Sequence, residues 1–252
     1  MHTVACCQAP VDDLDPEANL ARLDSRVADL PDRVEVALFP ELYLTGFVGD
    51  ERLDPVALGR DAPALDRVRA RARANDCAIL VGFAERDEDR LYNTAAYVTP
   101  EGETTYYRKR HLWGSERELL TPGTERVIVD TPLGRTGLVT CYDLNFVADS
   151  AAFTADRVDA LFVIGAWPAA HATNWRLLVR ARALDGVRWA VACGRTGRRE
   201  LDPVTTYAGR SLVARPNGTV HSALDVAGRS LVADLQTDEL SAYREEVGVF
   251  DP

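Results

Sequence analysis

The sequence predicts a mixed α/β protein, with many short strands and few helices, folded as a single layered domain over residues 1–252. Short apolar, β-prone runs alternate with polar stretches whose leucines and valines recur at helical spacing. The chain is 46% hydrophobic, which is enough to bury a sizeable core without disulfides or metals. No repeat, linker or low-complexity tract breaks this pattern, so one domain is favoured over several.

The first half of the chain contains two strand–helix units and then a run of strands. Apolar runs bounded by turn residues predict the strands, and helical periodicity predicts the helices. The expected strands are 3–9, 34–39, 77–84, 91–98 and 103–107, and the expected helices are 16–30 and 63–75. Two loops are expected, at 42–62, which is rich in glycine, and at 108–124, which mixes charged and aromatic residues.

The second half continues the alternation of strands and helices. Thr173 is expected to cap a helix that Gly186 ends, and Asn217–Gly218 predicts a hairpin turn. Two further helices are expected at 144–155 and 237–245. The expected strands are 126–130, 135–140, 160–166, 188–194, 207–215, 219–224 and 229–235.

Charge and hydropathy argue against several classes of partner. The net charge is -10, the pI is about 4.9 and no basic stripe stands out, so nucleic acid is not an expected partner. No segment approaches the roughly 20 apolar residues that a membrane span needs. Residues 1–10 lack the basic region and long apolar run of a signal peptide, so a cytoplasmic location is expected.

Lys109 is the only lysine in the chain, and the other lysine-or-arginine positions are all arginine. A lysine offers a compact ammonium that can lose its proton, whereas a guanidinium cannot. A surface lysine retained by chance is the simpler alternative. The arginine bias fits a GC-rich genome or adaptation to salt. Salt adaptation predicts activity that persists in molar KCl, and activity confined to dilute buffer would contradict it.

The five cysteines include no C-x-x-C pair, and their odd number argues against a disulfide framework or a zinc site. Cys6, Cys7, Cys77 and Cys193 lie in apolar runs and are expected to be small buried hydrophobic residues. Cys141 differs because an apolar strand ends there and a helix begins. Such a turn presents a nucleophile and brings helix N-terminal amides near the sulfur, where they favour a thiolate.

A thiol nucleophile needs a base, and the residues leave two possibilities open. His111 and His171 are possible partners in a papain-like Cys–His pair, although the local signatures of such enzymes are absent. Glu41 follows an apolar strand and Pro40. A glutamate in apolar surroundings has its pKa raised towards the range of a general base.

Three short motifs stand in a fixed order along the chain: Phe39–Pro40–Glu41–Leu42, Tyr107–Arg108–Lys109–Arg110–His111–Leu112 and Cys141–Tyr142–Asp143–Leu144. Trp167–Pro168, the helix around Trp175 with 181–184, and Gly209–Arg210–Ser211 accompany them. In order and approximate spacing, these segments resemble the nitrilase-like carbon–nitrogen hydrolases over essentially the whole chain. Each motif alone is weak, but their combination is specific.

The resemblance implies a four-layer αββα sandwich, a homodimer formed through helices, and a Glu–Lys–Cys triad. By position, Glu41 looks like the general base, Lys109 the cation that stabilises the tetrahedral intermediate, and Cys141 the nucleophile. Glu116 matches the second, supporting glutamate, and Glu118 competes for that place if the loop is shifted. No metal or organic cofactor is implied.

These roles combine into a consistent mechanism. Glu41 takes the thiol proton as sulfur attacks the amide carbon, while Lys109 and the backbone amide of Tyr142 hold the oxyanion. Glu41 then protonates the departing ammonia and later activates the water that hydrolyses the thioester. An arginine at position 109 could not sit as a point charge between two carboxylates, which accounts for the lone lysine.

The chain departs from the family's usual pattern near the expected substrate. Many members have Arg-Phe-Pro-Glu where this chain has Asn145–Phe146–Val147–Ala148, and often an asparagine where it has Gly194. These departures leave the triad alone but put the substrate in doubt. The residues expected to line the pocket are Trp113, Tyr142, Asn145, Phe146, Ala166 and Trp167.

The expected function is hydrolysis of a small linear carboxamide with release of ammonia, similar to an omega-amidase. A nitrilase or an N-carbamoyl amidohydrolase is the alternative within the family, and the short chain favours the amidase branch. An acyl transferase also remains open, since an amine can capture the same thioester. The alternative of another class is a non-catalytic binding or scaffold protein, in which Cys141→Ala would be without consequence.

Overall fold

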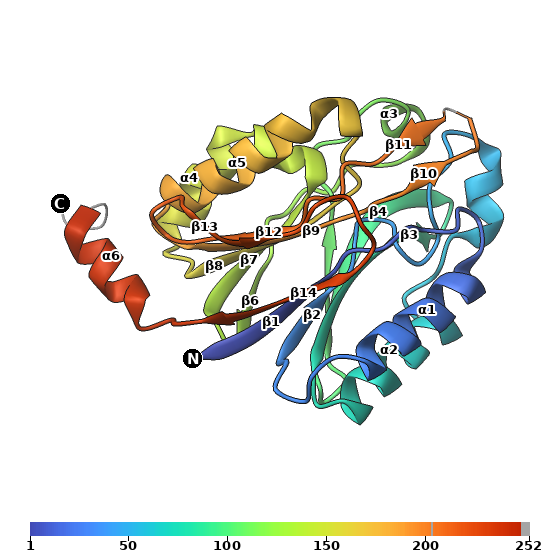
Figure 1. Cartoon of the computed structure of the whole chain (residues 1–252). Coiled ribbons are helices and arrows are strands. Elements are labelled where there is room, and N and C mark those ends of the chain that lie inside the picture. Colours follow the sequence, from blue (N-terminus) through green and yellow to red (C-terminus); the bar gives the residue numbers. More distant parts are fainter. Residues whose placement is uncertain (203, 248–252) are drawn as a thin grey trace.

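The computed structural model describes residues 1–202 and 204–247 and contains two six-stranded sheets packed face to face between pairs of helices. Figure 1 shows the four layers from the side. One outer layer consists of α4 (Val147–Ala155) and α5 (Ala172–Leu184), and the other of α1 (Pro16–Ala28) and α2 (Pro63–Ala74). The αββα sandwich predicted from the sequence is confirmed.

The first sheet is built from the first half of the chain and the last strand. From edge to edge it contains β14 (Ser230–Leu235), β1 (His2–Cys7), β2 (Val36–Leu38), β3 (Ala78–Asp87), β4 (Arg90–Val98) and β5 (Thr104–Arg108). The central strands β1, β2 and β3 are parallel, and the other pairings are antiparallel. β2 stops two residues before Pro40, which cannot donate a ladder hydrogen bond.

The second sheet repeats this plan. From edge to edge it contains β13 (Val220–Ala223), β12 (Leu212–Ala214), β9 (Trp189–Gly194), β8 (Ala160–Gly165), β7 (Gly134–Thr140) and β6 (Ile128–Thr131). Strands β7, β8 and β9 are parallel and lie at its centre. Segments that follow parallel strands at their carboxyl ends are common places for binding sites in α/β proteins.

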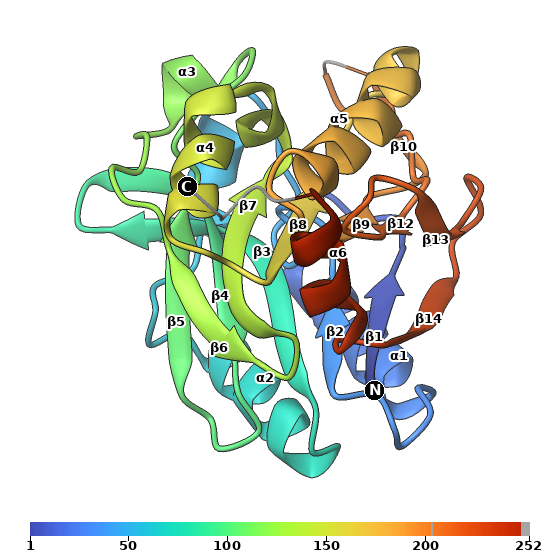
Figure 2. The ribbon, with the colours of Figure 1, turned by 90° about the vertical axis from the view of Figure 1, so that its left-hand side faces the viewer.

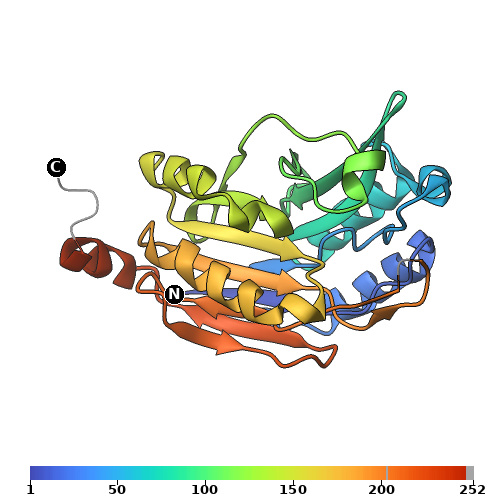
Figure 3. The ribbon, with the colours of Figure 1, turned by 90° about the horizontal axis from the view of Figure 1, so that it is seen from above.

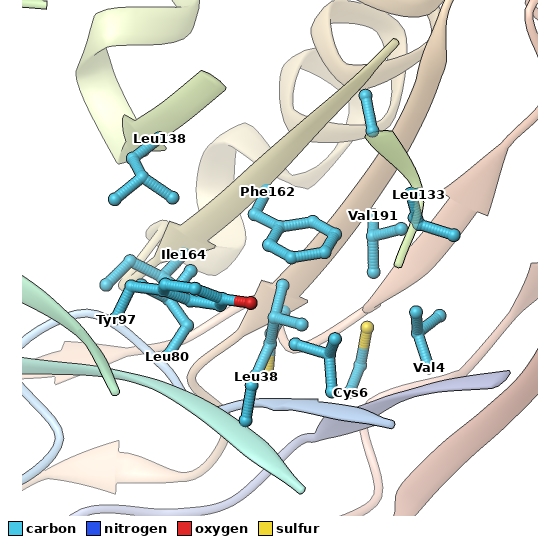
Figure 4. Close-up of a cluster of buried hydrophobic side chains, with 14 of the residues drawn as sticks. Val4, Cys6, Leu38, Leu80, Tyr97, Leu133, Leu138, Phe162, Ile164 and Val191 are labelled. Carbon is cyan, nitrogen blue, oxygen red and sulfur yellow. The ribbon is translucent and has the colours of Figure 1, made fainter. Parts of the chain in front are cut away.

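The apolar core has three layers, one between the sheets and one beneath each pair of helices. Figure 4 shows the central layer, in which Cys6 and Leu38 of the first sheet face Phe162 and Val191 of the second. Cys193 lies in the same layer. The four cysteines predicted to be small buried residues are all buried, so that prediction is confirmed.

The structure corrects the sequence prediction mainly in the connections. The short elements are η1 (Glu51–Val56), α3 (Glu116–Leu119), η2 (Cys141–Asn145), η3 (Ala169–His171), β10 (Arg198–Arg199), β11 (Thr205–Thr206) and α6 (Glu239–Val247). Both expected loops therefore contain a helical turn. The prediction that Thr173 caps α5 is wrong, because η3 leads directly into α5 and His171 occupies the N-cap. The strand expected at 207–215 is confined to β12, since Tyr207 instead bridges to Pro168 beyond β8.

α6 projects from the end of the sandwich where the N-terminus lies, as the side and top views show (Figures 1 and 3). Figure 2 looks at this end, with α6 in front of the sheets. Arg244 of α6 anchors the helix through an ion pair with Asp159 at 2.8 Å. None of the helices that the structure describes combines the length and hydrophobicity needed to span a bilayer.

Candidate active site

The residues singled out from the sequence meet at the end of the sandwich opposite α6, where α3, β10 and β11 gather (Figure 1). Glu41 follows β2 and Lys109 follows β5, both in the first sheet. Cys141 follows β7 of the second sheet. Both sheets therefore contribute side chains to one site.

Glu41 lies in a tight turn after β2, and its side chain is 2% exposed. The next residue, Leu42, has a φ of 52°, a left-handed conformation that is strained for a branched side chain. The turn presses against β3. A Cβ at Gly82 would lie 2.4 Å from the Leu42 nitrogen and 2.8 Å from the Glu41 Cα. A glycine at position 82 is thus required for Glu41 to sit where it does.

Lys109 lies between two glutamates. Its Nζ donates to Glu41 Oε1 at 2.8 Å and to Glu116 Oε2 and Oε1 at 2.7 and 3.0 Å. Burial lowers the pKa of Lys109, but the charges of Glu116 and Glu41 outweigh burial and hold that pKa well above its usual value. Of the two glutamates considered for the supporting position, Glu116 is the one in contact, whereas Glu118 is exposed on α3.

Asn93 of β4 bridges the same two glutamates, and the sequence analysis did not single it out. Its Nδ2 donates to Glu41 Oε1 at 2.8 Å and to Glu116 Oε1 at 2.7 Å. Its backbone oxygen accepts a hydrogen bond from the Lys109 nitrogen at 2.8 Å. The signal available in the sequence was an amide inside the largely apolar strand expected at 91–98.

Cys141 is the first residue of η2 and has a φ of 48°. This strained strand-to-helix turn resembles a nucleophile elbow, and the side chain borders a cavity. Burial and the charge of Glu41 raise the pKa of the thiol well above its usual value, although Lys109 opposes them. The expectation that helix amides favour a thiolate is wrong here, because burial and Glu41 shift the thiol pKa in the opposite direction.

Glu41 also differs from its expected protonation behaviour. Burial raises its pKa, but the charge of Lys109 and hydrogen bonds from Lys109, Cys141 and Asn93 bring the pKa below its ordinary value. Its Oε2 accepts a further hydrogen bond from the Ala166 nitrogen at 2.7 Å. The surroundings are polar rather than apolar, so Glu41 rests as a carboxylate that accepts hydrogen bonds from Lys109, Asn93 and the Ala166 nitrogen.

Asp143 joins the turn of Cys141 to the segment around Lys109. Its Oδ2 accepts hydrogen bonds from the Tyr107 hydroxyl at 2.6 Å and the Thr140 nitrogen at 3.1 Å. Its Oδ1 accepts one from the His111 nitrogen at 3.0 Å. Burial raises the pKa of Asp143 to about 6. These bonds set the position of Cys141 relative to Lys109.

A cavity of about 730 Å³ opens onto Glu41, Lys109 and Cys141, within the usual range for small-molecule sites. Five of the six residues expected to line a pocket do line it: Trp113, Tyr142, Asn145, Ala166 and Trp167. Phe146 does not. Its ring stacks on His111 with the centroids 3.5 Å apart, and it borders a smaller, separate pocket.

Two arginines that the sequence analysis did not single out also border the cavity. Arg195 forms a two-pronged ion pair with Asp13 at 2.6 and 2.9 Å, and its guanidinium lies 4.1 Å from the centroid of Tyr207. Arg199 donates to the Phe47 oxygen at 2.7 Å. Both guanidinium groups therefore hold aromatic residues of the cavity wall in place.

Gly194, which replaces an asparagine common in the resembling family, has a steric explanation. A Cβ at this position would lie 2.3 Å from the Gly209 oxygen. The segment before β12 passes too close for any side chain. The departure therefore reflects local packing and removes a polar group from this end of β9.

The histidines do not form a Cys–His pair of the kind left open by the sequence. The His111 ring is bound to Asp149 Oδ2 at 2.8 Å and stacked on Phe146. His171 borders the cavity. The carboxylate that borders the cavity together with Cys141 is that of Glu41. In the described part of the chain, no group of three or more His, Cys, Asp or Glu is placed to hold a metal ion.

Comparison with known proteins gives consistent matches along the chain. The model of the carbon–nitrogen hydrolase family matches residues 3–245. The chain is 34% identical over 237 residues to an (R)-stereoselective amidase from a Pseudomonas species, covering 93% of this chain and 85% of that enzyme. It is 28% identical over 246 residues to an omega-amidase of Yersinia enterocolitica, covering 96% of this chain and 93% of that enzyme.

The fold is similar to a solved structure from Xanthomonas campestris, a carbon–nitrogen hydrolase superfamily protein with an arsenic adduct in its active site. The TM-score is 0.93 at 26% sequence identity, and the alignment covers all of this chain and 98% of the other.

Proposed function

Because this chain belongs to the carbon–nitrogen hydrolase family and is a hydrolase of carbon–nitrogen bonds, we propose that it cleaves a small linear carboxamide through a thioester on Cys141. The observation that carries the proposal is that Cys141 borders the same cavity as the buried Glu41 carboxylate, itself paired with Lys109 at 2.8 Å. This arrangement supplies a nucleophile, a base and a cation within one cavity.

In the proposed reaction, the thiol proton passes to Glu41 as sulfur bonds to the amide carbon. Lys109 and the backbone amide of Tyr142 stabilise the oxyanion. The carbon–nitrogen bond then breaks, and Glu41 returns the proton to the departing ammonia. Water, activated by Glu41, attacks the thioester and releases the acid and the free thiol. Since the thiol pKa is raised and that of Glu41 lowered, proton transfer is expected to accompany sulfur attack rather than precede it.

The substrate class is proposed from the relatives and from the size of the cavity. An omega-amidase and an (R)-stereoselective amidase stand among the similar proteins, which supports a carboxamide. A nitrile or an N-carbamoyl compound is the alternative within the family. Capture of the thioester by an amine instead of water would make the protein an acyl transferase.

The test is ammonia release from a panel of linear amides, nitriles and ureido acids. Wild type is compared with Cys141→Ala and with Cys77→Ala, which changes another buried cysteine outside the cavity. We expect release from an amide that Cys141→Ala abolishes and Cys77→Ala retains. Release that survives in Cys141→Ala, or folded wild type that forms no thioester with any amide, would refute the proposal and favour a binding protein.

A homodimer formed through the outer helices is also proposed. Leu177 and Leu184 of α5 are 60% and 50% exposed, and their spacing of seven places them on one helix face. Val147 of the neighbouring α4 is 64% exposed. Light scattering during size-exclusion chromatography is expected to give a dimer that Leu177→Glu dissociates, and a monomeric wild type would contradict this.

A further inference from the structure

Packing alone does not explain the choice of side chain at position 93. Asn93 is 1% exposed in the interior of β4, where an apolar side chain such as leucine is the usual occupant. Its Oδ1 is buried and has no hydrogen-bond partner among the described residues. An unpaired buried acceptor destabilises a fold. The asparagine is therefore explained by the hydrogen bonds that its Nδ2 donates.

The orientation of the amide follows from its neighbours. Nδ2 directs its two hydrogens to Glu41 Oε1 at 2.8 Å and Glu116 Oε1 at 2.7 Å. The flipped amide would point an oxygen at two carboxylates and would be repelled by both. Aspartate at this position would add a third negative charge, and leucine would remove both donors.

Several hydrogen-bond donors surround the two glutamates. Lys109 contributes one positive charge against two negative charges, and Asn93 supplies uncharged donors to both carboxylates. Glu116 Oε2 also accepts from the Trp113 nitrogen at 2.8 Å. Two buried carboxylates near one cation would otherwise tend to hold a proton between them.

We propose that Asn93 is a positioning residue that holds the Glu41 carboxylate against Lys109 through Oε1 and leaves Oε2 of Glu41 to take the Cys141 proton. Oε1 of Glu41 already accepts hydrogen bonds from Lys109 and Asn93. Oε2 accepts one from the Ala166 nitrogen. This role rests on the proposed function of Glu41 as the general base.

The groups that face Glu41 set the sign of the effect. Lys109 favours its ionised form, and the charge of Glu116 opposes it. Cys141 hydrogen-bonds to the ionised form as a thiol. Removing the Asn93 donor takes away one group that stabilises the ionised form of Glu41, so the pKa of Glu41 rises. The acid limb of activity, where the base becomes protonated, then moves to higher pH.

The test compares Asn93→Leu with the matched control Thr94→Val. Thr94 is the next residue of β4, is equally buried, and donates to the carboxylate of Glu85 at 2.6 Å. Both variants lose a buried hydrogen bond to a carboxylate, but Thr94→Val does so away from the cavity. We expect the acid limb of kcat/KM to rise by about one pH unit in Asn93→Leu and to stay at the wild-type pH in Thr94→Val.

Alkylation of Cys141 by iodoacetamide, followed against pH by mass spectrometry, gives the same information without turnover. Wild type that releases no ammonia from any amide would refute the proposed function, while alkylation would still test Asn93. A folded Asn93→Leu variant whose acid limb is unshifted overturns the role of Asn93. If Asn93→Leu does not fold, Asn93→Ser is measured instead. A smaller shift in the same direction supports the role, and no shift overturns it.

Discussion

The Tyr107 hydroxyl donates to Asp143 at 2.6 Å, so the strand that leads to Lys109 is joined to the turn that begins at Cys141. The two residues come from different sheets, β5 in the first and η2 after β7 in the second. The hydrogen bond therefore couples the position of Cys141 to that of Lys109. The first two predictions below concern the two partners of this hydrogen bond, Tyr107 and Asp143.

Removing the hydroxyl should loosen the coupling without changing the packed volume. For Tyr107→Phe we expect kcat to fall roughly tenfold with little change in KM, and the free energy of unfolding to fall by about 1–2 kcal/mol. Tyr97→Phe serves as the control because Tyr97 is a buried tyrosine in the adjacent strand, away from Asp143. Steady-state kinetics and urea unfolding measure both effects, and equal losses in the two variants would contradict the prediction.

Asp143 should give the fold a measurable dependence on pH. Burial raises its pKa from 3.8 to about 6, so the folded state holds this proton more tightly than the unfolded state does. Its ionisation therefore costs stability as the pH rises from about 4 through 6. Relative to Asp143→Asn, the wild-type free energy of unfolding should fall by about 2 kcal/mol between pH 4 and pH 7. Urea unfolding at both pH values measures this, and a constant difference would rule it out.

Removing the cation should leave two buried carboxylates uncompensated. Lys109→Met is expected to abolish ammonia release and to lower the free energy of unfolding by about 3–5 kcal/mol at pH 7. The loss should shrink towards pH 5, because one carboxyl of the pair then takes up a proton. Adding Glu116→Gln should restore part of the stability and none of the activity. An Lys109→Met variant as stable as wild type at pH 7 would show that the ion pairs of Lys109 with Glu41 and Glu116 do not stabilise the fold.

The close approach of Glu41 to β3 makes a steric prediction. In Gly82→Ala the new methyl group would meet the backbone of Glu41 and Leu42, so we expect kcat to fall at least tenfold and Tm to drop by several degrees. Gly228→Ala is the control, because its Cβ would make only ordinary contacts, the nearest at 3.4 Å. Kinetics and thermal unfolding of the two variants test this, and a fully active Gly82→Ala would refute it.

The sequence predicted the parts of the site that depend on local pattern. Glu41, Lys109 and Cys141 each lie in a short motif at the end of a strand, and the alternation of strands and helices predicted a mixed α/β domain. The four-layer arrangement came from the family resemblance. Thr173 was misjudged as a cap because a preceding turn of three residues leaves no signal of its own.

The missed features depend on contacts between segments distant in the sequence. Asn93 became visible only when β4 was placed beside the Glu41 turn, 52 residues away. The pKa of Glu41 was expected to rise because its sequence neighbours are apolar. The ammonium of Lys109, 68 residues away, reverses the direction. Phe146 left the expected pocket because the His111 ring offers it a stacking partner.

Contacts between the two sheets also have a consequence for refolding. Glu41 of the first sheet accepts a hydrogen bond from the Ala166 nitrogen, which follows β8 of the second. After dilution from denaturant, strands and helices can form within each half before the halves meet. The geometry around the thiol cannot exist until they dock. Recovery of catalysis should therefore trail recovery of the far-ultraviolet circular dichroism signal, which makes ammonia release a kinetic reporter of the docking step.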